Sequence, residues 1–565
     1  MVFHSILDPF FIYQKHVMSV VACRVAVRVV LACITIIPLM AALILEIKLV
    51  KIGAVVTFGV YGFWITLHTL LQVVFSLRNY HDMENLHRCW EFHENGTIGL
   101  QVVGYQEDPV LFKQCCESVK TMREHHEFIT QVVCVVDGNE TEADLQMVDV
   151  FRQVFPHAAY YNLKLLPTVP FHVPESENVY IVTQPHGGKR DALRTAMLQN
   201  LASDVDYIML VDSDTIVDRE APMHLKKVLD RDVNKRLGAV AGDIRIFNVT
   251  NLLTLLISLK YFMAFNLERA AQSTFNVVAC VGGPLGLYRS EVIEQVLDKW
   301  YHQHFLGKPC TYGDDRHLTN QVLHLGLGVK YNHRAFCYTD TPESLKRWML
   351  QQTRWNKSGL REFWITVQAL HKHSLWLTFD LIFLTFYSFF IVAILITVLL
   401  EFSVRQLVGL YGVIFVISGL RSFYGLIMKH DWHFLTLAWY GFIYLHVILP
   451  CKLWASVTLW STGWGTSSRF YFRDSWTSVL PLIVWNGLLA TGSALTFQKD
   501  WDNFSPILSL VLGCLVLGSL LFAVSKSCIL RGVQQQIQTY LNRDSVSNLL
   551  TLEDDGQVSL VLPTV

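Results

Sequence analysis

Apolar segments long enough to cross a lipid bilayer constrain the fold of this 565-residue chain more than any other feature. A membrane-spanning helix needs about 20 mainly apolar residues. Two segments near the amino terminus meet this requirement, Val17–Leu45 and Gly53–Leu77. Five more follow in the last third of the chain: Leu375–Leu400, Leu407–Met428, Phe434–Leu459, Val479–Phe497 and Ile507–Ala523. The sequence therefore predicts an integral membrane protein with α-helical spans in a lipid bilayer.

The composition agrees with a lipid environment. Charged residues make up 16% of the chain, whereas soluble domains contain about 25%. The formal net charge is −1, so the chain lacks the overall positive field of a nucleic-acid-binding protein, and nucleic acid is not an expected partner. The 12 cysteines form no CxxC pair and no zinc-like spacing, which excludes a cysteine metal cluster or a disulfide framework as the organising feature.

The central block, residues 79–375, has the pattern of an α/β domain. Short apolar strands are predicted at Ile98–Val103, Val132–Val136, Val179–Val182 and Ile208–Val211. Helices between or after them are predicted at Val110–Met122, Ala143–Phe155 and Lys189–Leu201. Such alternation is typical of a parallel sheet. Leu252–Phe265 and Leu345–Trp364 mix apolar, aromatic and charged residues, and we expect amphipathic helices on the membrane surface there.

An Asp-x-Asp motif follows one of the predicted strands. The chain contains four such motifs, but only Asp212-Ser213-Asp214 stands directly after a buried strand. Ligands of open α/β sheets bind at the carboxyl ends of strands. Paired carboxylates there can hold a hard divalent cation that also binds substrate phosphate oxygens. We predict Asp214 and Asp212 as the metal ligands, and we interpret the other three motifs as solvated turns or interface charge.

Other strand ends and one helix start carry groups suited to a nucleotide. Tyr105 and Glu107 follow the first predicted strand, and Asp137 follows the second. A carboxylate at this edge can accept hydrogen bonds from uracil or ribose, or it can cap a turn or helix. His186-Gly187-Gly188-Lys189-Arg190 opens a helix, where a positive helix end, flexible glycines and basic side chains favour an anion. Lys189 is therefore a predicted phosphate ligand.

Two further motifs supply a base and an acceptor surface. Transfer onto a hydroxyl needs a carboxylate to take its proton, and a carboxylate that coordinates a cation is a poor base. Asp314 and Asp315 form a second acidic pair far from the first. Gln351, Arg354 and Trp355 share one helix face at Q-x-x-R-W spacing, where Arg can grip a diphosphate and Trp offers a flat surface. The alternatives are a surface Asp-Asp-Arg turn and an ordinary interfacial helix.

In this order the motifs resemble those of the processive family-2 glycosyltransferases, which include hyaluronan, chitin and cellulose synthases and share a GT-A catalytic fold. Longer strings are similar to hyaluronan synthases: Gly283–Arg289, Asp314–Asn320, Thr341–Trp355 and Trp464–Arg469. The likeness covers almost the whole chain. It departs from the animal members at Gly282, where serine is expected.

The resemblance implies an enzyme that transfers GlcNAc and GlcA alternately from UDP-GlcNAc and UDP-GlcA, with inversion and with Mn2+ or Mg2+. The nascent hyaluronan would leave through the membrane helices. The alternatives are a chitin synthase-like enzyme that polymerises one sugar, and a membrane transporter or receptor whose transferase-like domain is not catalytic. A hyaluronan synthase needs both donors to make long product, whereas a chitin synthase-like enzyme needs one. Mutation of Asp214 or Asp315 should abolish UDP release by an enzyme, but should not change it if the domain is not catalytic.

The resemblance also implies roles for single residues. Asp137 would contact the uridine, Asp212 and Asp214 would serve metal and nucleotide, and Asp315 would be the base beside Asp314. Gln351, Arg354 and Trp355 would shape the acceptor site. Trp464, Thr466 and Arg469 would belong to a gating loop that closes over bound UDP; as an isolated string this segment also fits an ordinary aromatic interface loop.

The gating loop constrains the membrane topology. Two amino-terminal spans place the catalytic block and the amino terminus on the same, cytoplasmic side. If Phe434–Leu459 crossed the membrane fully, the Trp464 loop would lie outside, away from UDP. Pro450 and Lys452 weaken that segment as a span, so we predict a re-entrant or interfacial path. Arg421, inside another apolar segment, would line the polymer path or snorkel to the interface.

The predicted protein is therefore a multi-pass plasma-membrane enzyme with about six spans plus interfacial helices, working as a monomer. Its GT-A-like α/β domain is cytoplasmic. The predicted parts are two amino-terminal spans (1–78), the glycosyltransferase domain (79–375), a channel region (376–530) with a re-entrant segment (434–460) and a gating loop (461–474), and a partly disordered cytoplasmic tail (531–565).

Overall fold

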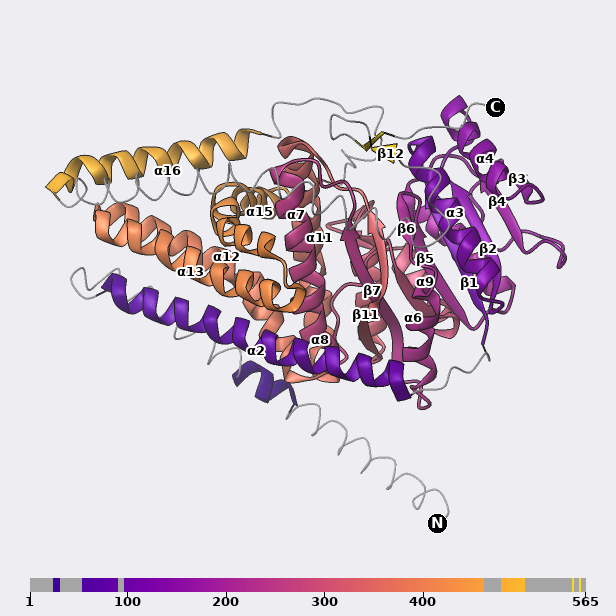
Figure 1. Cartoon of the computed structure of the whole chain (residues 1–565), viewed down its shortest axis with the longest axis horizontal. Coiled ribbons are helices and arrows are strands. Elements are labelled where there is room, and N and C mark those ends of the chain that lie inside the picture. Colours follow the sequence, from indigo (N-terminus) through magenta and orange to yellow (C-terminus); the bar gives the residue numbers. More distant parts are fainter. Residues whose placement is uncertain are drawn as a thin grey trace, which may run out of the picture.

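The computed structural model describes residues 24–30, 53–89, 96–461 and 479–502, together with two short strands, β12 (Thr551–Leu552) and β13 (Val558–Ser559). These residues form an α/β domain joined to a bundle of long helices (Figure 1). The predicted gating-loop residues Trp464, Thr466 and Arg469 lie outside the described residues. So do the predicted span Ile507–Ala523 and most of Val17–Leu45.

A nine-stranded sheet forms the centre of the α/β domain. Its strands in spatial order are β3 (Ala159–Asn162), β4 (Val179–Thr183), β2 (Ile129–Val136), β1 (Ile98–Gly104), β5 (Tyr207–Asp212), β8 (Gly286–Arg289), β7 (Leu237–Ile246), β11 (Gly328–Thr339) and β6 (Thr215–Val217). The four predicted strands are confirmed as β1, β2, β4 and β5. The sheet is parallel from β3 to β5 and between β7 and β11, but β8 and β6 run antiparallel to their neighbours, so the expectation of a parallel sheet is met only in part.

The register of the parallel half brings the ends of three strands together. Val103 pairs with Asp212, and Gly104 pairs with Val136. All residues of β1 are buried, because helices cover the sheet. These helices are α3 (Pro109–His125), α4 (Glu142–Val154), α5 (Lys189–Ala202), α6 (Ala221–Asp230), α9 (Ser290–Tyr301) and α10 (Asp314–His324). The predicted helices are confirmed as α3, α4 and α5, and the polar residues that follow β1, β2 and β5 share one edge.

Four apolar helices in the described part of the chain are long enough to cross a membrane. They are α12 (Leu375–Glu401), α13 (Val404–Lys429), the stretch Trp432–Val457, and α16 (Leu480–Lys499). Trp432–Val457 is irregular and consists of η3 (Trp432–Trp439), α14 (Tyr440–Ile443), η4 (Tyr444–Ile448) and α15 (Leu449–Val457). The count of six spans and the re-entrant path of 434–460 stay predictions, because length and composition alone do not distinguish a crossing from a return.

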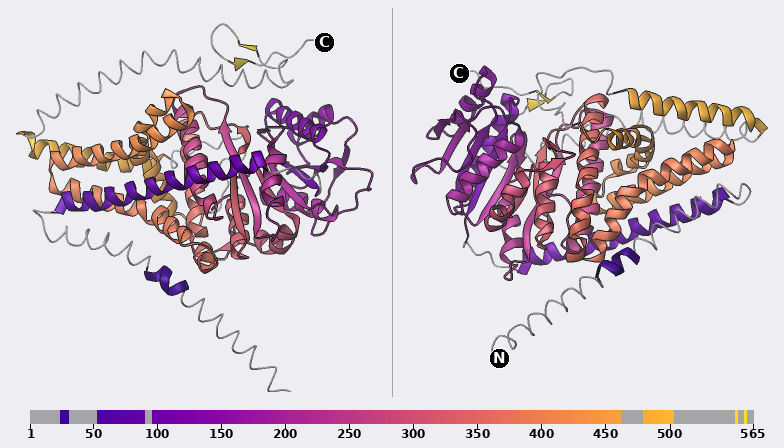
Figure 2. Two further views of the ribbon diagram at one scale, coloured as in Figure 1. Left: turned by 60° about the horizontal axis from the view of Figure 1, so that its bottom comes forward. Right: turned by 180° about the vertical axis from the view of Figure 1, so that it is seen from behind.

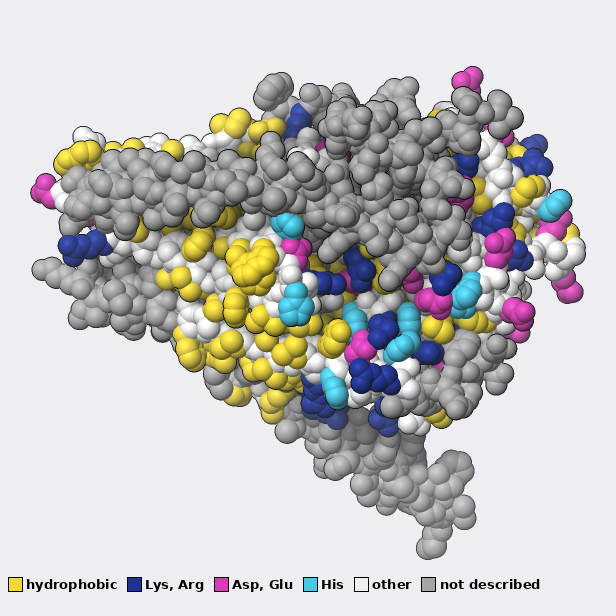
Figure 3. Space-filling view, viewed as in Figure 1, with side chains coloured by type: hydrophobic (Ala, Val, Ile, Leu, Met, Phe, Trp, Pro, Cys, Tyr) yellow, Lys and Arg dark blue, Asp and Glu magenta, His cyan; other side chains and the backbone are white. Residues whose placement is uncertain are grey.

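The helix α2 (Gly53–Cys89) joins the two halves of the molecule, and it extends well beyond the predicted span Gly53–Leu77 (Figure 2). Its carboxyl-terminal part is tied to the sheet by an ion pair between Glu84 and Arg334, with 2.6 Å between Oε2 and Nη2. On the face shown in Figure 3, apolar side chains gather over the helical bundle, whereas charged and histidine side chains gather over the α/β domain. This division fits a bundle in lipid beside a domain in water.

Further helices lie between the sheet and the bundle (Figure 1). They are α7 (Leu252–Met263), the π-helix η1 (Ala264–Arg269), α8 (Ala270–Thr274) and α11 (Leu345–Ala369). The amphipathic helices expected at Leu252–Phe265 and Leu345–Trp364 are therefore present as helices. Asn251 begins α7 with a capping box, in which its side chain accepts from the Thr254 N–H.

Candidate active site

One cavity of about 1290 Å³ lies at the edge where β1, β2 and β5 end. Every predicted site residue within the described ranges lines it: Tyr105, Glu107, Asp137, Lys189, Asp212, Asp214, Asp314, Asp315, Gln351, Arg354 and Trp355. The wall also includes Leu384 of α12 and Tyr440 of α14. Residues more than 250 positions apart in the sequence therefore share one space that reaches apolar helices of the bundle.

The glycine loop before α5 is held by Asp137. The buried Asp137 carboxylate accepts hydrogen bonds from the N–H groups of Gly187 at 3.0 Å and Gly188 at 2.8 Å. Gly188 has φ +110°, a conformation that favours glycine. The His186 ring lies 2.9 Å from the same carboxylate and stacks on Tyr105 with 4.3 Å between ring centroids. Asp137 thus organises the loop, and the Tyr105–His186 pair forms a flat aromatic wall of the cavity.

The cavity floor carries more negative than positive charge. Lys189, the first residue of α5, forms an ion pair with Asp212. Burial raises the pKa of Asp212, and the neighbouring Asp214 and Asp315 raise it further against the opposing effect of Lys189. Burial alone would lower the pKa of Lys189, but the carboxylates, Asp212 foremost, outweigh it and raise that pKa. Both shifts indicate a surplus of carboxylates, which a cation would relieve.

The carboxylates at the end of β5 fit a hard divalent cation. Asp212 and Asp214 offer oxygen ligands, the type that Mg2+ and Mn2+ prefer. The backbone passes close by, because a Cβ on Gly283 would stand 2.9 Å from an Asp212 carboxylate oxygen. Only glycine allows this approach without a shift. Two protein carboxylates leave further positions of the coordination shell to water and phosphate oxygens.

The two carboxylates at the start of α10 point in different directions. Gly313 precedes them in the left-handed conformation, with φ +88°. Asp314 turns to the interior, where its Oδ1 lies 2.6 Å from Nε of Arg190 and both side chains are 7% exposed. Asp315 lines the cavity, with the Cys280 thiol 3.4 Å from its Oδ2. Both residues line the cavity, but the Asp314 carboxylate is held in a buried ion pair with Arg190.

The helix α11 provides the opposite wall. The Trp355 ring is 40% exposed and lies 6.3 Å from the Tyr261 ring, measured between centroids. Burial lowers the pKa of Arg354 from its very high ordinary value, while Asp315 and Asp314 oppose this shift. Within the part of the chain that the structure describes, the side-chain oxygen of Gln351 is buried without a hydrogen-bond partner. A ligand in the cavity could satisfy this oxygen.

Sequence reasoning missed an ion cluster where the cavity meets the bundle. Glu268 of η1 lies 2.7 Å from the Lys260 ammonium and 3.1 Å from the Arg421 guanidinium. Lys260 and Glu268 line the cavity. Arg421 therefore pairs with a residue of the cavity wall, and the two predicted alternatives for it, lining the polymer path and snorkelling to the interface, stay predictions. Charged residues within apolar segments were the available signal, because they usually face a partner or a polar path.

Residues 171–358 match a protein family described as "Glycosyltransferase like family 2". With the mixed α/β sheet and the acidic cavity at its strand ends, this match defines a glycosyltransferase. A mannosyltransferase from Pyrobaculum calidifontis, solved with GDP-Man and Mn2+, aligns with 71% of this chain and 99% of its own length at 13% identity, with a TM-score of 0.41.

Three relatives narrow the class. Hyaluronan synthase 1 of Xenopus laevis is 34% identical and aligns over 82% of this chain and 83% of its own length. Hyaluronan synthase 2 of Homo sapiens is 34% identical and aligns over 83% of this chain and 86% of its own length. Hyaluronan synthase 3 of Mus musculus is 32% identical and aligns over 82% of this chain and 86% of its own length. The chain belongs to the hyaluronan synthase family. This finding confirms the predicted enzyme class, and with the four apolar helices it supports a membrane protein.

Proposed function

We propose that this enzyme builds hyaluronan by alternate, inverting transfer of GlcNAc and GlcA from UDP-GlcNAc and UDP-GlcA, and that it passes the polymer across the membrane. The observation that carries the proposal is the single cavity. It combines a carboxylate pair at a strand end, a separate carboxylate on α10, an Arg-Trp helix face and a wall of apolar helices. Each is needed for one part of processive transfer.

The donor binds along the sheet edge. Tyr105, Glu107 and Asp137 line the uridine end of the cavity, and Lys189 and Arg354 bind the diphosphate. Asp212 and Asp214 would hold a Mn2+ or Mg2+ ion, which supplies positive charge to the diphosphate when bound. Lys189 also neutralises part of the charge that develops on departing UDP, a form of electrostatic stabilisation.

Asp315 acts as the base. The terminal sugar of the acceptor lies over Trp355, and its hydroxyl gives a proton to the Asp315 carboxylate as it attacks the anomeric carbon of the donor. The new carbon–oxygen bond forms on the face opposite UDP, and the bond from the anomeric carbon to the phosphate oxygen breaks. UDP leaves with that electron pair. An α-linked donor therefore gives a β-linkage.

The polymer leaves toward the bundle. A polar polysaccharide cannot cross lipid without a protein path, because its hydroxyls would lose their hydrogen bonds. Leu384 and Tyr440 give the cavity a wall of bundle residues, and Glu268 adds a polar group there. The catalytic domain faces the cytoplasm, where UDP-sugars are made, and the protein is a multi-pass monomer. Tyr312, between the cavity-lining residues Thr311 and Gly313, donates to the Ser461 carbonyl at 3.0 Å.

Purified protein with Mn2+ should form long polymer only when both UDP-sugars are supplied. The physical reason is that an alternating chain cannot extend past one unit without the second donor. Gel electrophoresis of radiolabelled product, before and after hyaluronan lyase, measures this. Long product from UDP-GlcNAc alone would favour a chitin synthase-like enzyme, and lyase-resistant product would reject hyaluronan.

Replacing Lys189 by alanine should raise the KM for both donors by about 10- to 100-fold, since a charge-assisted hydrogen bond contributes about 1.5–3 kcal/mol. Initial rates of UDP release over a range of each donor measure the change. Lys120→Ala is the matched control, because Lys120 is 44% exposed, pairs with Glu124 on the same helix and does not line the described cavity. Equal KM values for wild type and Lys189→Ala would remove Lys189 from the donor site.

A further inference from the structure

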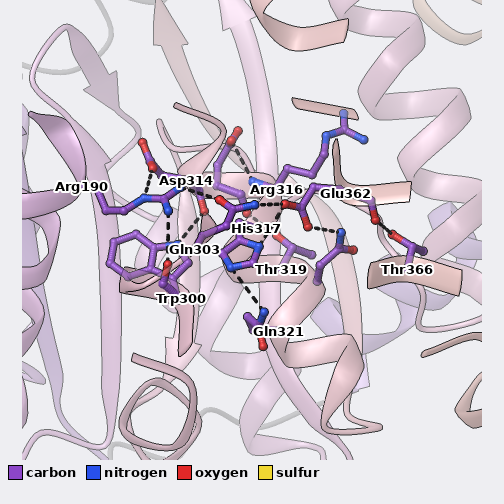
Figure 4. Close-up of polar contacts among 12 residues, drawn as sticks. Arg190, Trp300, Gln303, Asp314, Arg316, His317, Thr319, Gln321, Glu362 and Thr366 are labelled. Carbon is purple, nitrogen blue, oxygen red and sulfur yellow. Dashed lines mark hydrogen bonds and ion pairs between the residues drawn. The ribbon is translucent and has the colours of Figure 1, made fainter. Parts of the chain in front are cut away.

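A buried polar network behind the cavity joins elements that carry the proposed chemistry (Figure 4). Its centre is Glu362 of α11, which is 2% exposed. The Glu362 carboxylate accepts hydrogen bonds from Asn320 at 2.7 Å and from Gln303, and it lies 3.0 Å from Nδ1 of His317. None of these four side chains lines the cavity, so the network does not contact substrate there.

The network continues from Glu362 to the donor side. Gln303 presents its amide nitrogen to Glu362 and its oxygen to Arg190, whose Nη2 lies 2.9 Å away. The same guanidinium holds Asp314 through Nε. Arg190 directly follows Lys189, which forms the ion pair with Asp212. One chain of contacts therefore runs from the start of α5 through α10 to α11.

The helix α10 is held in place by polar contacts at two positions. Arg190 holds its first residue, Asp314, and Glu362 holds His317 and Asn320 on the next turns. Asp315 lies between these contacts. On α11, Glu362 follows Trp355 by seven residues, or about two helical turns. Because an α-helix is stiff over two turns, fixing Glu362 against His317 also fixes Trp355 relative to Asp315.

The chemistry of the network favours a fixed geometry. Burial alone would raise the pKa of Glu362, but the hydrogen bonds from His317 and Asn320 hold that pKa below its ordinary value. A buried carboxylate is costly unless its hydrogen bonds are complete. A satisfied buried network is correspondingly rigid, and a single broken bond leaves an expensive unpaired group.

We propose that Glu362 is a positioning residue for glycosyl transfer: through His317, Asn320 and Gln303 it sets the distance between the base Asp315 on α10 and the acceptor surface of α11. This inference rests on the proposed function. It assigns Glu362 no contact with substrate. Its effect is on the alignment of two groups that do make contact, Asp315 and Trp355.

Glu362→Gln tests the proposal, because it keeps the size of the side chain but turns one acceptor oxygen into an N–H donor that faces Gln303 or Asn320. We expect kcat for polymer synthesis to fall by about 10- to 100-fold, the loss associated with a misplacement of about 1 Å. The KM for each UDP-sugar and the affinity for UDP should stay within about twofold of wild type, because the donor-binding side chains are unchanged. Glu362→Asp, which keeps the charge, should recover part of kcat.

Asp230→Asn is the matched control. Asp230 forms an ion pair with the fully buried Lys226, at 2.7 Å, outside the cavity lining. Both variants should lower Tm, but only Glu362→Gln should lower kcat at a temperature where both are folded. Equal kcat values in the two variants, or a rise in donor KM that accounts for the loss in Glu362→Gln, would overturn the proposal.

Gln303→Met gives a second test if Glu362→Gln fails to fold. It removes the bridge between Arg190 and Glu362 but leaves the His317 and Asn320 contacts, and we expect a kcat loss of about 3- to 10-fold with unchanged donor KM. An unchanged kcat would overturn the proposal. Wild-type protein separates this inference from the function: inactivity of wild type with both UDP-sugars rejects the function, whereas active wild type with fully active Glu362→Gln and Gln303→Met rejects only the positioning role.

Discussion

Replacing Asp315 by asparagine should lower polymer synthesis by about 10²- to 10⁴-fold, the usual contribution of a general base. An amide has nearly the same shape as the carboxylate but cannot accept the proton of the acceptor hydroxyl. Donor binding should remain, because Asp315 lies at the start of α10 rather than at the end of β5. Initial rates of polymer formation and the affinity for UDP, measured on the same preparation, separate the two effects.

The control for this prediction is Asp298→Asn on α9. The Asp298 side chain is 87% exposed, so the change should leave both rate and binding as in wild type. Asp314→Asn offers a second comparison, because the Asp314 carboxylate forms a buried ion pair with Arg190. Loss of this ion pair should lower Tm as well as the rate. If Asp315→Asn retained more than about a tenth of the wild-type rate, another group would have to be the base.

The position of Asp212 and Asp214 was predictable because it follows from a local rule. A run of apolar residues that ends in acidic ones places the carboxylates at the edge of the sheet, whatever the rest of the fold. The same rule covers Tyr105 and Asp137, whose strands end level with β5. The motif spacing on α11 was equally readable, since a single helix fixes which residues share a face.

The strands β8, β7, β11 and β6 were not predictable in the same way; β8 and β6 run antiparallel to their neighbours, whereas β7 and β11 pair in parallel. The strand β8 has only four residues, and β7 and β11 contain glycines and polar residues that mask their alternation. They become strands because they pair with each other and with β5, a tertiary effect that overrides local preference. The site could be predicted without these strands, because its residues follow the parallel strands β1, β2 and β5 or lie on helices.

The partners of the supporting residues could not be identified from the sequence, for a related reason. Glu362 gains its role from Gln303, His317 and Asn320, which lie 42 to 59 positions away in the chain. Glu268 gains its role from Arg421, which lies 153 positions away. No spacing rule links such residues, so a buried polar network can be read only from the folded chain. The residues that hold a site in place are therefore harder to predict than the residues that contact its ligands.

Replacing Asp214 by asparagine should remove the metal dependence of donor binding. The amide keeps one oxygen but loses the negative charge that holds a divalent cation, and the apparent affinity for Mn2+ in the presence of UDP should fall by at least about 100-fold, the upper range for losing even an outer-shell partner. Electron paramagnetic resonance of free Mn2+ measures this directly, without reference to catalysis. Polymer synthesis should fall in parallel at a fixed Mn2+ concentration.

The contrast that makes this result decisive is a second Asp-x-Asp motif in the same domain. Asp204 is exposed and has φ +52°, a conformation that asparagine adopts readily, so Asp204→Asn should leave Mn2+ binding unchanged. If both variants bound Mn2+ as wild type does, the cation site would not involve Asp214. Mn2+ would then bind through other groups, and the surplus of carboxylates around Asp212 would be balanced mainly by basic side chains of the cavity such as Lys189.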